Sequence, residues 1–130
     1  MRRFVFSLIP CLLSLSLFAA SPEREKSTPQ EVFDAMRAAF RPDKAIGVRA
    51  RYQFLISGSH GGEWWIEVSD GKNRMGRGTI ENPDVTLLAG EKDWVALSNG
   101  KLSGVWASLT GRLKVRGNQA LARKLDEMFP

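Results

Sequence analysis

The chain has 130 residues, of which 43% are hydrophobic and 25% charged, proportions that are ordinary for one soluble globular domain. Its 19 Lys and Arg residues against 14 Asp and Glu residues give a net charge of +5. That charge is too mild for a dedicated nucleic-acid binder, which concentrates more positive charge on one face. We therefore expect no nucleic-acid partner, whereas brief contact with an anionic membrane surface is compatible with this basicity.

The N-terminus has the pattern of a secretion signal: two arginines, an uncharged apolar run over residues 4–20, and then a polar stretch. We assign residues 1–20 to a signal peptide, residues 21–30 to a polar linker and helix start, and residues 31–130 to one folded domain. The protein is then expected to be exported, to the periplasm or out of the cell. The alternative is a retained membrane anchor, for which the run is slightly short and contains Pro10. Cys11, the only cysteine, lies inside the signal, so the mature chain would have no disulfide.

The first helix is predicted to begin after Thr28, which suits an N-cap. Pro29 would take the first helical position and Glu31 would complete a capping box. Apolar residues then recur at the spacing of one helix face as far as Phe40, and residues 41–43 end the helix.

The next segment has the pattern of several short strands. Apolar and polar residues alternate over residues 48–56, which predicts a half-buried strand. A second strand is predicted over residues 63–68, followed by a hairpin signal at residues 70–73. Weaker patterns predict a third strand near residues 74–79 and a fourth over residues 85–88.

The last third of the chain mixes both patterns. Helices are predicted over residues 91–98 and 102–108, a strand over residues 109–115, and a final helix that begins after Asn118. The sequence contains no internal repeat and no sign of a second domain. The order of elements predicts an α+β fold, with one sheet and helices packed on one of its faces.

Five short sequence blocks in the second half resemble the sterol-carrier-protein-2 (SCP2) lipid-transfer domain. They are PDVTL at 83–87, DWVAL at 93–97, GKL at 100–102, GRLKVRG at 111–117 and LARKL at 121–125. Each block alone is unspecific, but members of that family show the same blocks in the same order. With the less specific match of the preceding helix and hairpins, the resemblance covers nearly all of residues 31–130.

The resemblance implies a five-stranded, mainly antiparallel sheet with helices on one face and an apolar tunnel between them. It also implies binding of sterols, fatty acids, acyl-CoA or other lipids without any catalysed reaction. The chain departs from the peroxisomal members because it ends in Met128-Phe129-Pro130, without a peroxisomal address, and begins with an export signal. A sterol ligand therefore does not follow from the resemblance.

Large apolar side chains on the predicted helices and on the first strand are the candidates for a lipid-binding wall. The same residues would be expected in the core of a solid domain, so the alternative for each is ordinary packing. The candidate lipid-binding residues are Phe33, Met36, Phe40, Tyr52, Phe54, Ile56, Trp94, Leu97, Val105, Trp106, Leu125, Met128 and Phe129. The C-terminal helix is either a lid over such a cavity or an ordinary docked helix.

The sequence offers little for catalysis. His60 is the only histidine and lies among glycines in a predicted turn, and the mature chain would have no cysteine. Zinc sites and Cys–His nucleophiles therefore lack ligands. We expect no enzyme activity, no metal and no cofactor.

Two functions remain open at this stage. One is a monomeric carrier that holds a lipid or fatty acid in an internal tunnel. The other is an accessory module that docks on a partner enzyme or membrane complex and has no transferable ligand. The sequence names neither the lipid nor a partner protein.

Overall fold

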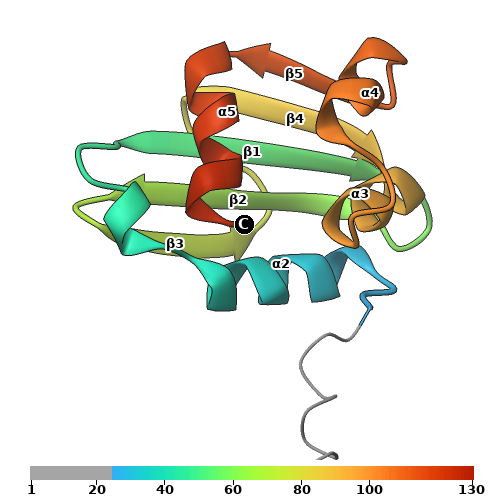
Figure 1. Cartoon of the computed structure of the whole chain (residues 1–130), viewed down its shortest axis with the longest axis horizontal. Coiled ribbons are helices and arrows are strands. Elements are labelled where there is room, and N and C mark those ends of the chain that lie inside the picture. The colour runs from blue at the N-terminus through green and yellow to red at the C-terminus, as the bar shows by residue number, and fades with distance from the viewer. Residues whose placement is uncertain (1–24) are drawn as a thin grey trace, which may run out of the picture.

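The computed structural model describes residues 25–130, which form one sheet covered by helices (Figure 1). In chain order the elements are α2 (Pro29–Ala39), the 3-10 helix η1 (Pro42–Lys44), β1 (Ala50–Ser57), β2 (Gly62–Ser69), β3 (Lys72–Arg77), β4 (Val85–Gly90), α3 (Glu91–Ser98), α4 (Gly104–Leu109), β5 (Leu113–Gly117) and α5 (Gln119–Met128). The predicted signal peptide, residues 1–20, lies outside the described residues. Within residues 25–130, no helix is long and apolar enough to cross a membrane.

The sheet has five strands in the order β3-β2-β1-β4-β5. All neighbouring strands are antiparallel except β1 and β4, which are parallel. Within residues 25–130, the four α-helices lie over one face of this sheet (Figure 1). The predicted α+β architecture is therefore confirmed, with one parallel pair at its centre.

The parallel pair requires the chain to cross from β3, at one edge, to β4 on the far side of β1. Residues 78–84 make this crossing over the face of the sheet that carries no helices. Gln53 on β1 holds the crossing in place: its Nε2 donates to Gly78 O at 3.0 Å and its Oε1 accepts from Ile80 N at 2.9 Å. As a result Gln53 is buried, although the alternation placed it on the solvated face.

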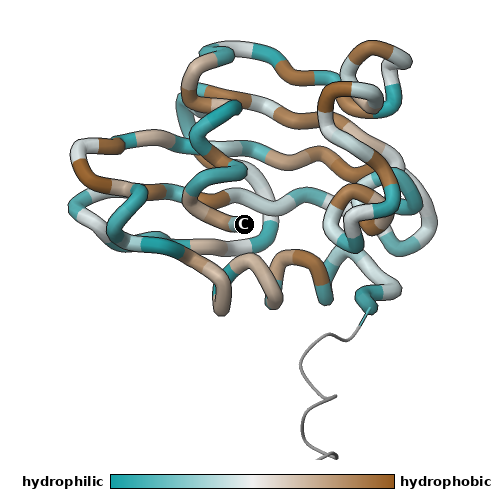
Figure 2. Tube along the Cα trace, viewed as in Figure 1, coloured by the Kyte–Doolittle hydropathy of each residue, from teal (hydrophilic) through white to brown (hydrophobic). Residues whose placement is uncertain are grey.

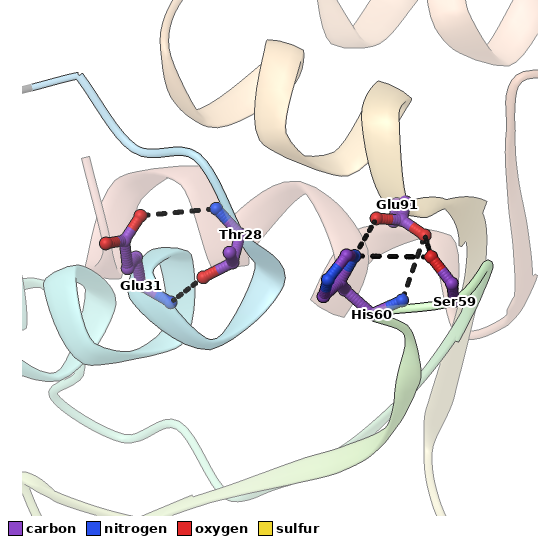
Figure 3. A network of polar contacts seen from close by, with 5 residues as sticks. All are labelled: Thr28, Glu31, Ser59, His60 and Glu91. Atoms are coloured by element: carbon purple, nitrogen blue, oxygen red, sulfur yellow. Dashed lines mark hydrogen bonds and ion pairs between the residues drawn. The ribbon is translucent and has the colours of Figure 1, made fainter.

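The helix α2 begins as predicted. Thr28 Oγ1 accepts a hydrogen bond from Glu31 N at 3.3 Å, and Glu31 Oε1 accepts one from Thr28 N at 3.2 Å (Figure 3). This capping box satisfies two backbone N–H groups that would otherwise be unpaired at the helix start. Pro29 occupies the first turn, where its missing N–H costs nothing.

An aromatic cluster centred on Phe33 joins α2 and α3 to the sheet. The ring of Phe33 lies 4.7 Å from Trp64, 5.0 Å from Phe54 and 5.4 Å from Trp94. All four side chains are buried. Such contacts add about 0.5–1.5 kcal/mol each to the free energy of unfolding beyond simple burial, so this end of the helical layer is solidly packed.

The predicted strand over residues 109–115 is wrong in its first half. Leu109 is the last residue of α4, and the strand β5 begins only at Leu113. Thr110 ends the helix by donating from its Oγ1 to Trp106 O at 2.8 Å, and Gly111 then turns the chain with a φ of 79°. The alternation across this boundary is a coincidence, because Leu109 belongs to the helix and residues 110–112 form the turn before the strand.

Candidate lipid-binding cavity

A cavity of about 840 Å³ lies between the helical layer and one side of the sheet. Its walls come from α2, α3, α4 and α5, and its floor comes from β4 and β5. This volume is within the range of about 300–1,000 Å³ that is usual for small-molecule sites. The cavity lies beside the aromatic cluster, where the packing between helices and sheet opens.

Small side chains explain why the layer is not filled here. Ala35 and Ala39 on α2 face the cavity one helical turn apart, and Ala122 faces it from α5. The floor includes Leu87 and Val115, which are neighbours on adjacent strands, and Leu113 on β5. A wall of alanines and branched aliphatic residues leaves an apolar space that offers a ligand dispersion contacts and few hydrogen bonds.

Polar groups are confined to a few positions of the lining. Lys26 and Arg123 bring two cationic side chains to it, and Asp126 brings a carboxyl group. Lys26 is positioned by paired hydrogen bonds with Asn99, from Lys26 N to Asn99 Oδ1 at 2.9 Å and from Asn99 Nδ2 to Lys26 O at 2.9 Å. Desolvation raises the pKa of Asp126 above its usual range, although the side chain still reaches water.

The structure divides the thirteen predicted lipid-binding residues into three groups. Six line the cavity: Met36, Trp94, Leu97, Val105, Leu125 and Phe129. Six lie outside the lining and pack beside it in the core: Phe33, Phe40, Tyr52, Phe54, Ile56 and Met128. Of these six, Phe40 is partly buried and the others are buried. Trp106 belongs to neither group, because it is 57% exposed. Whether any of them contacts a lipid stays a prediction.

Among the lining residues, Trp94 differs from its neighbours. It is buried, and its indole Nε1 has no hydrogen-bond partner within the described part of the chain. An unpaired buried donor costs about 1–3 kcal/mol. The wall therefore includes one donor that the rest of the fold does not satisfy.

Sequence reasoning missed the residues that make the space and the charges that border it. Ala35, Ala39 and Ala122 were not among the predicted residues, all of which have large apolar side chains. The four-residue spacing of Ala35 and Ala39 on one face of α2 was the signal that could have found these two. Arg123 was missed because a charged residue on an exposed helix usually only faces water.

The helix α5 is docked at its C-terminal end. Arg41 N donates to Met128 O at 2.8 Å, the ring of Phe40 lies 5.2 Å from that of Phe129, and Met128 is fully buried. These contacts join the end of α5 to the segment that follows α2. They favour a docked helix over a lid at this end of the chain.

Ser59, His60 and Glu91 form a polar cluster at the turn between β1 and β2 (Figure 3). Ser59 Oγ lies 3.3 Å from His60 Nδ1, and Glu91 Oε2 lies 3.2 Å from the same nitrogen. A Ser–His–acid relay needs the hydroxyl and the carboxylate on opposite ring nitrogens. The cluster is therefore a clamp on the turn, in which Glu91 Oε1 also accepts from His60 N at 3.0 Å.

Comparison with known proteins decides the family. Residues 33–130 match the model of the SCP-2 sterol transfer family. The chain belongs to this family. Its general class of function is accordingly lipid binding and transfer, on a fold that is not itself catalytic.

The relatives of this SCP2 domain include larger proteins. Hydroxysteroid dehydrogenase-like protein 2 of Bos taurus is 31% identical over 109 residues, which is 83% of this chain and 26% of the relative. This chain thus spans about a quarter of that relative's length. A sec-alkylsulfatase from Pseudomonas sp. contains a similar fold, with a TM-score of 0.66 and 22% identity over 79% of this chain and 16% of the sulfatase.

A stand-alone SCP2 protein is similar over nearly its whole length. It is the palmitated SCP2-like protein 2 of Aedes aegypti, whose solution structure gives a TM-score of 0.63 and 25% identity over 79% of this chain and 95% of that protein. The ligand named there is palmitate, a saturated fatty acid.

Proposed function

We propose that this SCP2 domain binds one acyl lipid non-covalently in the cavity of α2, α3, α4 and α5 and carries it without catalysing a reaction. The observation that carries the proposal is the apolar cavity of about 840 Å³ in a family of lipid-transfer domains. The palmitate of the Aedes aegypti relative supports an acyl chain as the ligand.

The composition of the walls determines what such a site can recognise. Each methylene removed from water contributes about 0.8 kcal/mol, whereas the apolar walls offer few polar groups to a rigid ring system. Affinity is then expected to rise with acyl chain length until the chain fills the cavity. Met36 suits this role, because a flexible thioether side chain adapts to differently shaped ligands.

The polar headgroup is expected near Lys26 and Arg123. Both side chains belong to the lining, and either can pair with a carboxylate or a phosphate. Asp126 lies in the same lining, and its raised pKa favours the neutral acid more than in an ordinary aspartate. A neutral Asp126 would not repel an anionic headgroup.

Native mass spectrometry of the whole protein, purified without detergent, tests the proposal, together with lipid extraction from the same sample. A near-stoichiometric acyl lipid supports it. Titration with fatty acids of increasing length, followed by the tryptophan fluorescence to which Trp94 in the wall contributes, gives the affinities. A protein that copurifies with no lipid and shows no fluorescence response would contradict it.

Two alanines of α5 provide a matched pair of variants. Ala122 faces the cavity and Ala120 faces solvent. We expect Ala122→Phe to lower the affinity for fatty acid at least tenfold, because the ring occupies the space of the ligand. Ala120→Phe should bind as the wild type does. Equal binding by both folded variants would place the lipid elsewhere.

A second candidate function is a module that presents its lipid to, or docks on, a neighbouring protein. It is favoured by the size of the relatives, since this chain covers 26% of the dehydrogenase-like protein and 16% of the sulfatase. Absence of a copurified lipid, combined with stable capture by one partner, would favour this function over carriage.

We also propose that the protein is exported by residues 1–20. The support is the basic start and the uncharged apolar run. Intact-mass measurement of the protein from its native host tests this. Loss of about the first twenty residues supports export, and an intact N-terminus in a membrane fraction would instead favour the retained anchor.

A further inference from the structure

The short helix α4 exposes an unusually apolar surface. Val105 is 74% exposed, Trp106 57% and Leu109 76%, while Ala107 is the only buried residue of the helix. Val105 and Leu109 are four residues apart and Trp106 adjoins them, so the three side chains share one side of the helix. Figure 2 shows brown stretches in α4 at the upper right margin of the molecule.

This apolar surface borders the cavity. Val105 and Leu109 are exposed and also belong to the cavity lining. Leu102 and Ser108 line the cavity beside them. Trp106 lies beside them but outside the lining. The α4 surface, defined as Val105, Trp106 and Leu109, is thus a rim of the cavity that faces solvent.

The surrounding segment carries charge of one sign only. Residues 94–125 contain no Asp or Glu and six basic residues: Lys101, Arg112, Lys114, Arg116, Arg123 and Lys124. Of these, Arg112 lies in the turn between α4 and β5, and Lys114 and Arg116 lie on the edge strand β5; all three are exposed. Within residues 25–130 none of these three forms an ion pair.

We propose that the α4 surface docks on an anionic lipid bilayer, with Trp106 at the level of the headgroups and the cavity rim against the membrane. Tryptophan beside aliphatic side chains is typical of segments that lie in a membrane interface. Each Lys or Arg near an anionic surface adds attraction that salt weakens. The proposal builds on the proposed function, because docking at the rim gives a lipid a short path between bilayer and cavity.

The same charges argue against a second copy of the chain as the occupant. A two-fold dimer would bring each α4 surface against its own copy, with the same basic segment around both. Like charges at a contact are unfavourable, so self-association through α4 would be opposed. An anionic bilayer offers both the apolar interior and the opposite charge.

Vesicle binding by the whole protein tests the proposal, using phosphatidylcholine vesicles with and without phosphatidylglycerol. We expect partition into the anionic vesicles to fall at least tenfold in Trp106→Ser. The control Ile46→Ser removes another exposed apolar side chain, 80% exposed and outside α4, and should bind as the wild type does. Residues 1–24 are common to all variants, so the differences report on α4.

Further variants test the contribution of charge to vesicle binding and the depth of Trp106 in the bilayer. Arg112→Gln with Lys114→Gln should weaken vesicle binding severalfold and reduce its salt dependence, whereas Lys72→Gln on the opposite edge strand, β3, should not. Brominated lipids should quench the emission of the wild type more than that of Trp106→Phe, because only Trp106 lies at the bilayer.

Fatty-acid binding in vesicle-free solution separates this proposal from the proposed function. Trp106 lies outside the lining, so Trp106→Ser should keep the wild-type affinity for a fatty acid. The protein could dock on vesicles through Trp106 and yet bind no fatty acid. That result would support the α4 proposal and overturn the carrier function. Vesicle binding that is equal in wild type and Trp106→Ser would overturn the α4 proposal, as would a dimer that only this variant loses.

Discussion

The hydroxyl of Tyr52, on β1, donates a 2.7 Å hydrogen bond to the carbonyl of Leu121, on α5. The ring of Tyr52 is completely buried between the sheet and the helix. This bond connects the central strand to the first turn of the last helix, and α5 forms one wall of the cavity. The phenol group of Tyr52 therefore helps to fix the position of that wall, together with the contacts at the C-terminal end of α5.

Tyr52→Phe removes this bond and keeps the ring. We expect the free energy of unfolding to fall by about 0.5–1.5 kcal/mol, since the Leu121 carbonyl loses its phenol partner. Urea unfolding of the wild type and the variant measures the difference. A loss larger than about 3 kcal/mol would instead indicate that the ring had moved, because that is more than the bond itself supplies.

The same residue predicts a loss of stability at alkaline pH. Burial, and secondarily the nearby Asp84 carboxylate, raises the pKa of Tyr52 well above its ordinary value of 10.0. Above pH 10 the unfolded chain releases the phenol proton while the folded chain keeps it, so stability falls as pH rises. Tyr52→Phe should lack this part of the decline.

The titration can be followed directly, because Tyr52 is the only tyrosine of the chain. Phenolate absorbance should rise together with the circular-dichroism signal of unfolding. A phenolate that forms at about pH 10 in a protein that is still folded would contradict the burial of Tyr52.

Local rules predicted the elements that depend on neighbouring residues. The sequence predicted the capping box of α2, the strand β1 and the Asn118 cap of α5. In this cap, Asn118 Oδ1 accepts a hydrogen bond from Leu121 N at 3.0 Å. The hairpin signal was correct too. However, the strand β3 begins at Lys72, two residues before the prediction, because the two-residue turn Asp70-Gly71 takes positive φ at both positions.

Features that depend on distant contacts could not be read in this way. The burial of Gln53 follows from a loop more than twenty residues away in the sequence, through its bond to Gly78. The exposure of Trp106 follows from the absence of any element over α4 in the described structure, whereas a tryptophan is highly buried on average. The periodicity of apolar residues predicts which face of a helix or strand is apolar, but it does not predict which other element packs against that face.

Trp65 and Gly76 give a prediction about the face of the sheet without helices. They are paired on β2 and β3, and a Cβ atom at Gly76 would come within 2.6 Å of the Trp65 ring. Valine usually stabilises a strand relative to glycine, but here we expect Gly76→Val to cost about 1–3 kcal/mol through overpacking. In a Trp65→Ala background the same change should be neutral or stabilising.

Chemical denaturation of the four proteins in this double-mutant cycle measures the coupling. A Gly76→Val penalty that is unchanged by Trp65→Ala would show that the strand backbone, and not the indole ring, requires glycine at this position.

The Glu91 clamp predicts a change at acid pH. The backbone N–H of His60 is the main cause that holds the pKa of Glu91 below its ordinary 4.5, with smaller contributions from the His60 ring and Ser59. Because the folded chain releases this proton more readily than the unfolded chain, the stabilisation is present above about pH 4.5 and is lost as pH falls through the lowered pKa. Glu91→Gln should therefore be less stable than the wild type at neutral pH, and the difference should disappear in acid.

Thermal unfolding between pH 2.5 and 7 checks this, with Glu63→Gln, an exposed glutamate on β2, as the control for removing one charge. Glu91 is also the first residue of α3, whose Trp94 and Leu97 line the cavity. Loosening the clamp should therefore weaken fatty-acid binding modestly as well as destabilise the turn. A Glu91→Gln protein whose stability follows the wild type at every pH would show that the turn holds its shape through its glycines alone.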